Sequence, residues 1–116
     1  MIPKELSLEV IQNTYHKLSP YVLKTPAIKG WSLISELLNT DVFFKMEFLQ
    51  NAGTFKARGA TNNILNLNSS QKALGVTAVS AGNHAIAASY VANKFNLKSV
   101  VLTFSPHPRT VLNPTA

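Results

Sequence analysis

Apolar residues recur at helical spacing in two segments near the start of the chain. The first segment, Ser7–Ser19, has Ser7 as a candidate N-cap and Pro20 beyond its end, and its apolar positions are Leu8, Ile11, Tyr15 and Leu18. The second begins at Ser32, another candidate cap, and stops at Asn39, with Leu33, Ile34, Leu37 and Leu38 on one side. The pattern predicts two amphipathic helices joined by a connector that contains Thr25-Pro26 and Gly30-Trp31.

The pattern then changes to alternation. In Asp41–Phe48 one set of alternate positions is Val42, Phe44, Met46 and Phe48, and the other is Phe43, Lys45 and Glu47, which predicts a strand buried on at least one face. A turn at Asn51-Ala52-Gly53 separates this strand from a helix expected over Thr54 to about Leu67, with Ala57, Ala60, Thr61 and Ile64 buried. The polar residues 68–70 and Gly75 are expected to form a connection.

Two further β-branched runs follow, with a helix between them. Val76–Val79 and Ser99–Phe104 predict strands, and residues 83 to about 96 predict a helix whose small side chains allow close packing. Prolines at 106, 108 and 114 oppose regular structure beyond them. The order strand, helix, strand, helix, strand predicts an α/β fold with a partial parallel sheet, right-handed crossovers and flanking helices. Three such strands leave unpaired edges and uncovered faces, so other copies, another chain or a longer design must complete the layer.

Composition narrows the classes of function. A chain of 116 residues with 46% apolar and 14% charged residues can bury one core. The first twenty residues lack a secretory apolar stretch and no window approaches a membrane span, so we expect a cytoplasmic protein with no membrane partner. The absence of cysteine excludes disulfides and thiolate chemistry, and three histidines with few acids predict no metal site.

The net charge of +6 comes from the part of the chain beyond Phe48, because the acids before it balance the lysines there. This excess could attract an anionic ligand or keep the surface soluble. Nucleic-acid binding would require clustered cations interleaved with aromatic residues, and the chain has neither, so we expect no nucleic-acid partner.

Lys56 is the first candidate for chemistry. It lies in the first turn of the helix that follows the glycine turn, where the helix dipole opposes a cation, and Arg58 nearby adds to the repulsion. With apolar cover from Phe55, this setting should favour the free amine that attacks an aldehyde. The alternative is that the long side chain extends past the helix end into solvent, and this stretch alone favours that alternative.

The second candidate is the turn Ser80-Ala81-Gly82-Asn83-His84, which also joins a strand to a helix. Ser80 and Asn83 can hydrogen-bond a ligand, Gly82 permits close approach of the backbone, and the following N–H groups can hold an anion. In isolation, helix capping is the simpler use of Ser80 and Asn83, and a surface position is the simpler one for His84. Because both turns would open at the carboxyl edge of one parallel sheet, we expect them to face each other.

The two motifs together resemble the fold-type-II pyridoxal-phosphate enzymes, and within them the branch of serine/threonine dehydratases and serine racemases. The run from Lys45 through Glu47, Gln50, Gly53, Phe55, Lys56, Arg58 and Gly59 to Ala60 is similar to the family's lysine signature, Ser80–His84 to its substrate loop, and Thr25-Pro26 to a pair found in such enzymes. The resemblance implies the tryptophan-synthase-β-like fold, of which this chain covers the N-terminal part.

The resemblance also implies roles for individual residues. Lys56 would be the catalytic residue, forming the internal aldimine with pyridoxal 5′-phosphate and moving the α-proton, while Phe55 would flank the cofactor. Asn83 would hydrogen-bond the cofactor's 3′-oxygen, and the substrate-binding loop on the amino-acid carboxylate would comprise Ser80, Ala81, Gly82, Asn83 and His84. Racemases of this branch tend to carry a second serine where this chain has Ala81, which favours elimination of water from threonine or serine to a 2-oxo acid and ammonia.

The same resemblance divides the chain and sets an expectation for its activity. Residues 1–50 would belong to the large domain, 51–104 to part of the small, lysine-bearing domain, and 105–116 to an irregular tail. The five glycines are dispersed, so no glycine-rich phosphate loop is present, and we expect the isolated chain to bind cofactor weakly and to be weakly active or inactive. The expected partners are an amino-acid substrate and either further copies of the chain, a longer homologue or a second fragment. The alternative is a non-catalytic α/β module that associates with a longer homologue.

Overall fold

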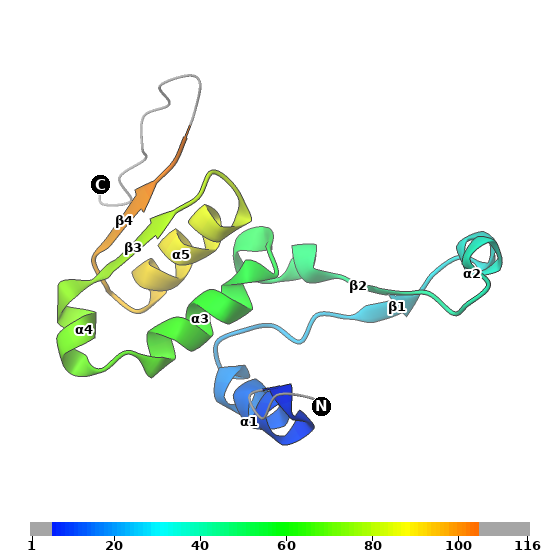
Figure 1. The fold of residues 1–116 in the computed structure, drawn as a ribbon, viewed down its shortest axis with the longest axis horizontal. Coiled ribbons are helices and arrows are strands. Elements are labelled where there is room, and N and C mark those ends of the chain that lie inside the picture. The colour runs from blue at the N-terminus through cyan, green and yellow to red at the C-terminus, as the bar shows by residue number, and fades with distance from the viewer. Residues whose placement is uncertain (1–5, 105–116) are drawn as a thin grey trace.

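Two helices packed side by side form the centre of the fold (Figure 1). The computed structural model describes residues 6–104. Helix α3 (Lys56–Asn66) lies against α5 (Asn83–Lys94), and α5 also packs on the strands β3 (Val76–Val79) and β4 (Ser99–Leu102). These strands pair in parallel, with Val76 opposite Ser99 and Val79 opposite Leu102. The predicted strand–helix–strand unit is therefore confirmed.

The core lies between α3 and α5. Its buried members are Ala60, Ile64, Ala87, Val91 and Ala92, with Leu67, Val76, Phe95 and Leu97 packed against them. Small side chains predominate, so the two helices approach closely, as the alanines of the second helix predicted. All four positions expected to be buried on α3 are buried.

The remaining helices agree with the sequence in part. Helix α1 (Leu8–Leu18) begins at Ser7, whose hydroxyl accepts a hydrogen bond from the Val10 amide, as predicted. Helix α2 (Ser32–Leu38) ends at Asn39 in the left-handed conformation, but its N-cap is Trp31 rather than Ser32. Residues 69–74, expected to be part of a connection, form helix α4 (Ser69–Leu74). Asn68 and Gln71 stabilise its start as a reciprocal capping box, a local signal that was present in the sequence.

The predicted strand over 41–48 is wrong in extent, burial and pairing. Only β2 (Phe43–Lys45) is a strand, all three of its residues are exposed, and the chain turns into 3₁₀ geometry at Glu47. It pairs antiparallel with β1 (Ala27–Lys29), a strand inside the expected connector, and not with β3. The hairpin extends away from the two-helix core (Figure 1), and its side chains Ile28, Phe43 and Phe44 remain 46%, 61% and 37% exposed. The parallel sheet of the described chain therefore has two strands, not three.

Many large apolar side chains lie on the surface. The radius of gyration is 17.5 Å, compared with about 13 Å for a compact domain of this length. Trp31 and Phe104 are each 82% exposed, and Val79, Val100 and Leu102 of the parallel sheet are about 60% exposed. The expectation of uncovered sheet surface is thus confirmed for the described residues. None of the helices within residues 6–104 is both long and apolar enough to span a membrane.

Candidate functional site

The start of α3 carries Lys56 as its first helical residue. The Thr54 hydroxyl oxygen accepts a hydrogen bond from the Lys56 amide at 3.3 Å, and Thr54 itself is buried. The Lys56 side chain is exposed, and its Nζ lies 5.1 Å from the centroid of the Phe55 ring. A cation at that position is attracted by the face of the ring. The amine is therefore accessible, as the solvent-exposed alternative predicted, but it has an aromatic neighbour.

The turn before α3 is tight, as expected from its glycine. Ala52 has φ 61° and Gly53 has φ 64°, so two successive residues are in the left-handed region. Glycine adopts this conformation without a steric penalty, whereas alanine does so at a cost of about 1 kcal/mol. This turn reverses the chain between the 3₁₀ segment and α3, and thereby sets where Lys56 begins.

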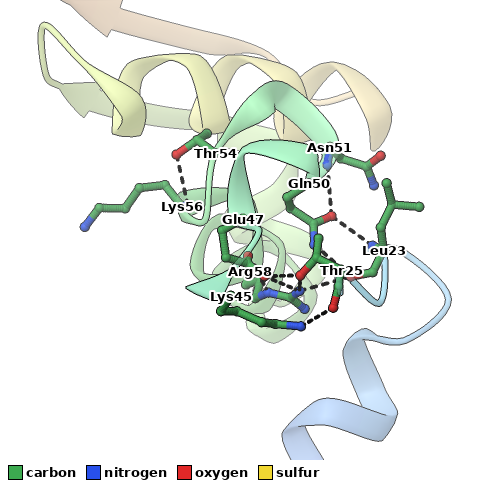
Figure 2. Close-up of polar contacts among 9 residues, drawn as sticks. All are labelled: Leu23, Thr25, Lys45, Glu47, Gln50, Asn51, Thr54, Lys56 and Arg58. Atoms are coloured by element: carbon green, nitrogen blue, oxygen red, sulfur yellow. Dashed lines mark hydrogen bonds and ion pairs between the residues drawn. The ribbon is translucent and has the colours of Figure 1, made fainter. Parts of the chain in front are cut away.

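Arg58 does not add its charge to that of Lys56, which corrects the sequence-based expectation. Its guanidinium forms a bidentate ion pair with Glu47: Nε donates to Oε2 at 2.8 Å, and Nη2 donates to Oε1 at 2.8 Å. Figure 2 shows the Lys56 side chain pointing away from this pair. Thr25 donates its hydroxyl to Glu47 Oε1 at 2.5 Å, and Lys45 Nζ donates to the Thr25 carbonyl oxygen. Arg58 and Lys45, the other two cations of the lysine motif, are therefore bound to other groups.

The ion pair shifts the ionisation of both partners. The Arg58 hydrogen bond, together with the Thr25 hydroxyl and the nearby positive charges, lowers the pKa of Glu47 to about 2 against the opposing effect of burial. The carboxylate in turn raises the pKa of Arg58. Side-chain exposure is 28% for Arg58 and 18% for Glu47, so the pair is largely shielded from water. At neutral pH the pair is fully charged.

Gln50 joins this cluster to the segment Tyr21–Thr25, which we call the strap (Figure 2). Gln50 is 3% exposed, and its side-chain amide forms two hydrogen bonds with the Leu23 backbone, as the backbone of a neighbouring strand would. Its Oε1 accepts from the Leu23 amide and its Nε2 donates to the Leu23 carbonyl oxygen, both at 2.8 Å. Gln50 and Thr25 belong to the motifs described above, but the sequence predicted no contacts for them. No periodicity within either segment signals the Gln50–Leu23 contact, because it joins residues 27 positions apart.

The loop Ser80–His84 joins β3 to α5 as predicted, but it does not cap the helix in the predicted way. The N-cap is Gly82, which offers no side-chain hydrogen bond, while the Ser80 hydroxyl accepts from the Gly82 amide at 3.2 Å. Asn83 is already the first helical residue. A methyl group at Gly82 would meet nothing within 4 Å, so the loop is open on that side. The simpler capping role for Ser80 and Asn83 is wrong, and the start of α5 is available for an anion.

The two candidate stretches lie at the same end of the helix layer, although β2 is not part of the parallel sheet. Figure 1 shows α3 and α5 both beginning at that end. A hollow of about 160 Å³ is lined by His84 and Ala88 of α5, by β3 and, from α3, by Ala60, Asn63 and Ile64. Ala60 is one helical turn after Lys56, and His84 is exposed. Within residues 6–104, no hydrogen bond joins the Lys56 side chain to the loop.

Comparison with known proteins gives concordant matches. A sequence model of the family described as "Pyridoxal-phosphate dependent enzyme" matches residues 18–113. Phenylserine dehydratase from Ralstonia pickettii is 41% identical over 95 residues, which cover 82% of this chain and 29% of that enzyme. The catabolic L-threonine dehydratase of Staphylococcus aureus is 33% identical over 110 residues, 95% of this chain and 32% of the relative.

Solved structures match as well. The crystal structure of serine racemase from Dictyostelium discoideum aligns with a TM-score of 0.77 at 35% identity, over 88% of this chain and 33% of the racemase. The chain thus spans about a third of the length of these relatives. The likeness confirms the α/β fold that the order of strands and helices predicted and its resemblance to serine racemase.

Proposed function

Because this chain belongs to the family of pyridoxal-phosphate-dependent enzymes, we propose that it carries the lysine-bearing part of an enzyme that removes ammonia from L-threonine or L-serine. The observation that carries the proposal is the accessible Lys56 amine at the start of α3, at the same end of the helix layer as the open start of α5. The dehydratases among the relatives support elimination. Ala81, in place of the second serine that racemases tend to carry, supports the same choice.

The residues present fit one end of the cofactor. Lys56 offers an amine to its aldehyde carbon, and Phe55, 52% exposed, offers an apolar surface beside that amine. Asn83 at the start of α5 can donate to a phenolic oxygen. When bound, pyridoxal phosphate supplies the electron sink that stabilises negative charge on the substrate α-carbon.

The remaining steps fall to the chain's own groups. The Ser80–His84 loop, with the N–H groups at the start of α5, binds and orients the substrate carboxylate, since those donors lack a side-chain cap. Lys56 Nζ takes the α-proton, because the amine is exposed at the same end of the layer. We assign residues 1–50 to the large domain and residues 51–104 to part of the small domain. The assigned tail, 105–116, lies outside the described residues.

Covalent trapping tests the assignment of Lys56. The full chain is incubated with pyridoxal phosphate, reduced with sodium borohydride and analysed by peptide mass spectrometry. We expect a pyridoxyl group on Lys56 that is lost in Lys56→Ala and retained in the matched surface variant Lys98→Ala. Labelling of Lys56 no greater than that of the other lysines would contradict the proposal. A stable visible absorbance band from the isolated chain, lost in Lys56→Ala, would instead contradict our expectation that it binds the cofactor weakly.

Elimination itself is tested by complementation. We expect little 2-oxobutanoate from L-threonine with the chain alone, and release of this product when a fragment carrying the remaining two-thirds of a related dehydratase is added. Release of D-allo-threonine, the product of inversion at the α-carbon alone, in place of the 2-oxo acid would identify a racemase.

The exposed apolar surface supports a second candidate, a non-catalytic module that docks on a longer homologue. Val79, Val100 and Leu102 of the parallel sheet are each about 60% exposed, a surface that proteins rarely leave uncovered. A stable complex of defined mass with a homologue, without any label on Lys56, would favour this module over the enzyme.

A further inference from the structure

We propose that the strap, Tyr21–Thr25, is a positioning element for Lys56, held by side chains of the lysine motif itself. The inference rests on the proposed function and deepens it, because it gives Gln50, Glu47 and Arg58 a role in directing the amine rather than in binding the cofactor. None of these three touches the reacting atoms. They act through the first turn of α3.

The strap is held almost entirely by side chains. Its alternate carbonyl oxygens, at residues 21, 23 and 25, each accept from one or two side-chain donors, and no neighbouring strand pairs with them in the described chain. Asn51 Nδ2 and Lys94 Nζ donate to Tyr21 at 2.9 and 3.0 Å. Gln50 Nε2 and Arg58 Nη2 donate to Leu23 at 2.8 and 3.0 Å. Lys45 Nζ donates to Thr25.

These donors come from the elements that decide where Lys56 lies. Gln50 and Asn51 lead into the left-handed turn before α3, and Arg58 lies in the first turn of α3, two residues after Lys56. Lys94 is the last residue of α5. Next to it, the ring of Phe95 packs on the ring of Tyr21, with the two ring centroids 5.1 Å apart. The strap therefore connects the beginning of the lysine helix to the end of the helix whose beginning carries the Ser80–His84 loop.

The contacts that Gln50, Asn51 and Lys45 make with the strap are partly buried, whereas those of Arg58 with Leu23 and of Lys94 with Tyr21 are exposed. Gln50 and Thr25 themselves are 3% and 4% exposed, so loss of the Gln50 contacts leaves a buried side-chain amide without its hydrogen bonds. Glu47 makes the Arg58 contact possible, because its carboxylate balances the guanidinium within a largely shielded site. In contrast, the Lys29–Asp41 pair of the hairpin is 60% and 64% exposed.

The start of α3 needs this support. Phe55 at its N-cap makes no side-chain hydrogen bond, and the Thr54 hydroxyl binds only the Lys56 amide. A helix end with few such bonds opens readily. Arg58 ties the first turn to the strap, which keeps Lys56 on the side of α3 opposite the ion pair (Figure 2).

The test compares Arg58→Met, Arg58→Lys and Gln50→Glu with two control variants of the full chain. Asp41→Asn also removes one partner of an ion pair, and Gln12→Glu makes the same chemical change as Gln50→Glu at an exposed position of α1. We expect Arg58→Met to slow borohydride trapping of pyridoxal phosphate on Lys56 by about tenfold while trapping on Lys98 changes less than twofold. Arg58→Lys should trap Lys56 faster than Arg58→Met but slower than the wild type, because lysine keeps the positive charge but cannot form the bidentate contact with Glu47.

Hydrogen exchange supplies a readout that needs no cofactor. We expect the amides of Leu23, Ala57 and Arg58 to exchange about tenfold faster in Gln50→Glu and Arg58→Met, and unchanged in the two controls. The proposal is overturned if Arg58→Met slows trapping equally at Lys56 and Lys98. It is also overturned if trapping at Lys56 is unchanged in both Arg58→Met and Gln50→Glu. If wild-type Lys56 is not trapped at all, the proposed function fails, and the exchange rates alone decide the strap. Gln50→Glu keeps the test valid if Arg58→Met does not fold.

Discussion

Arg58 and Glu47, eleven residues apart in the chain, form two parallel hydrogen bonds of 2.8 Å between guanidinium and carboxylate. The pair joins the 3₁₀ segment before the glycine turn to the first turn of α3 after it. It therefore braces the turn from both sides, and its charges are held away from Lys56 (Figure 2).

The first prediction concerns the strength of this pair. Glu47→Gln should lower the free energy of unfolding by about 1–3 kcal/mol, because it leaves the largely shielded guanidinium without its counter-charge. Asp41→Asn, in the exposed pair with Lys29, should change it by less than about 0.5 kcal/mol. Urea unfolding followed by circular dichroism measures both. Equal effects of the two variants would show that the pair does not brace the turn.

The second prediction concerns pH. The folded pKa of Glu47, about 2, lies below its ordinary value of 4.5, so its contribution to stability is complete above pH 4.5 and is lost as the pH falls from 4.5 toward 2. The loss should reach at most about 3 kcal/mol. Glu47→Gln should flatten the slope of stability against pH in this interval. An unchanged slope would assign the acid sensitivity to other carboxyl groups.

The third prediction concerns two glycines. At Gly75, which has φ +86°, an added Cβ would lie 2.5 Å from the Lys98 carbonyl oxygen, so Gly75→Ala should destabilise the fold by more than about 2 kcal/mol. Gly59 lies within α3 and a Cβ there meets nothing within 4 Å, so Gly59→Ala should stabilise by about 0.5–1 kcal/mol. Thermal melting distinguishes the two. Similar melting temperatures for both variants would contradict the close approach of the chain at Gly75.

The fourth prediction concerns the two-helix core. Ile64 is 4% exposed between α3 and α5, so Ile64→Ala should cost about 2–4 kcal/mol through lost contacts and a residual cavity. Leu74 is 85% exposed, and Leu74→Ala should change stability by less than about 0.5 kcal/mol. Denaturant midpoints provide the measurement. A cost at Leu74 as large as at Ile64 would mean that another surface covers Leu74 in solution.

Local patterns in the sequence predicted four of the described helices, α1, α2, α3 and α5, and the parallel unit. Ser7 capped α1, the four predicted positions of α3 were buried, and the runs at 76–79 and 99–102 paired around α5. These features depend on spacing along one element or on neighbouring elements, which a single sequence records. The Lys56 and Ser80–His84 motifs likewise lie where a strand or turn passes into a helix, as predicted.

Tertiary structure alone decided the partners of the polar groups and of the second strand. Phe43–Lys45 paired with β1 instead of entering the parallel sheet, because the chain turned at Glu47 before reaching it. Arg58 turned to Glu47 rather than toward Lys56, and Gln50 reached back 27 residues to Leu23. Contacts between residues so far apart in the sequence depend on the conformation of every turn between them. The periodicity of a single segment carries no information about those turns. The sequence by itself thus determined which residue offers the amine, and the fold determined what holds it in place.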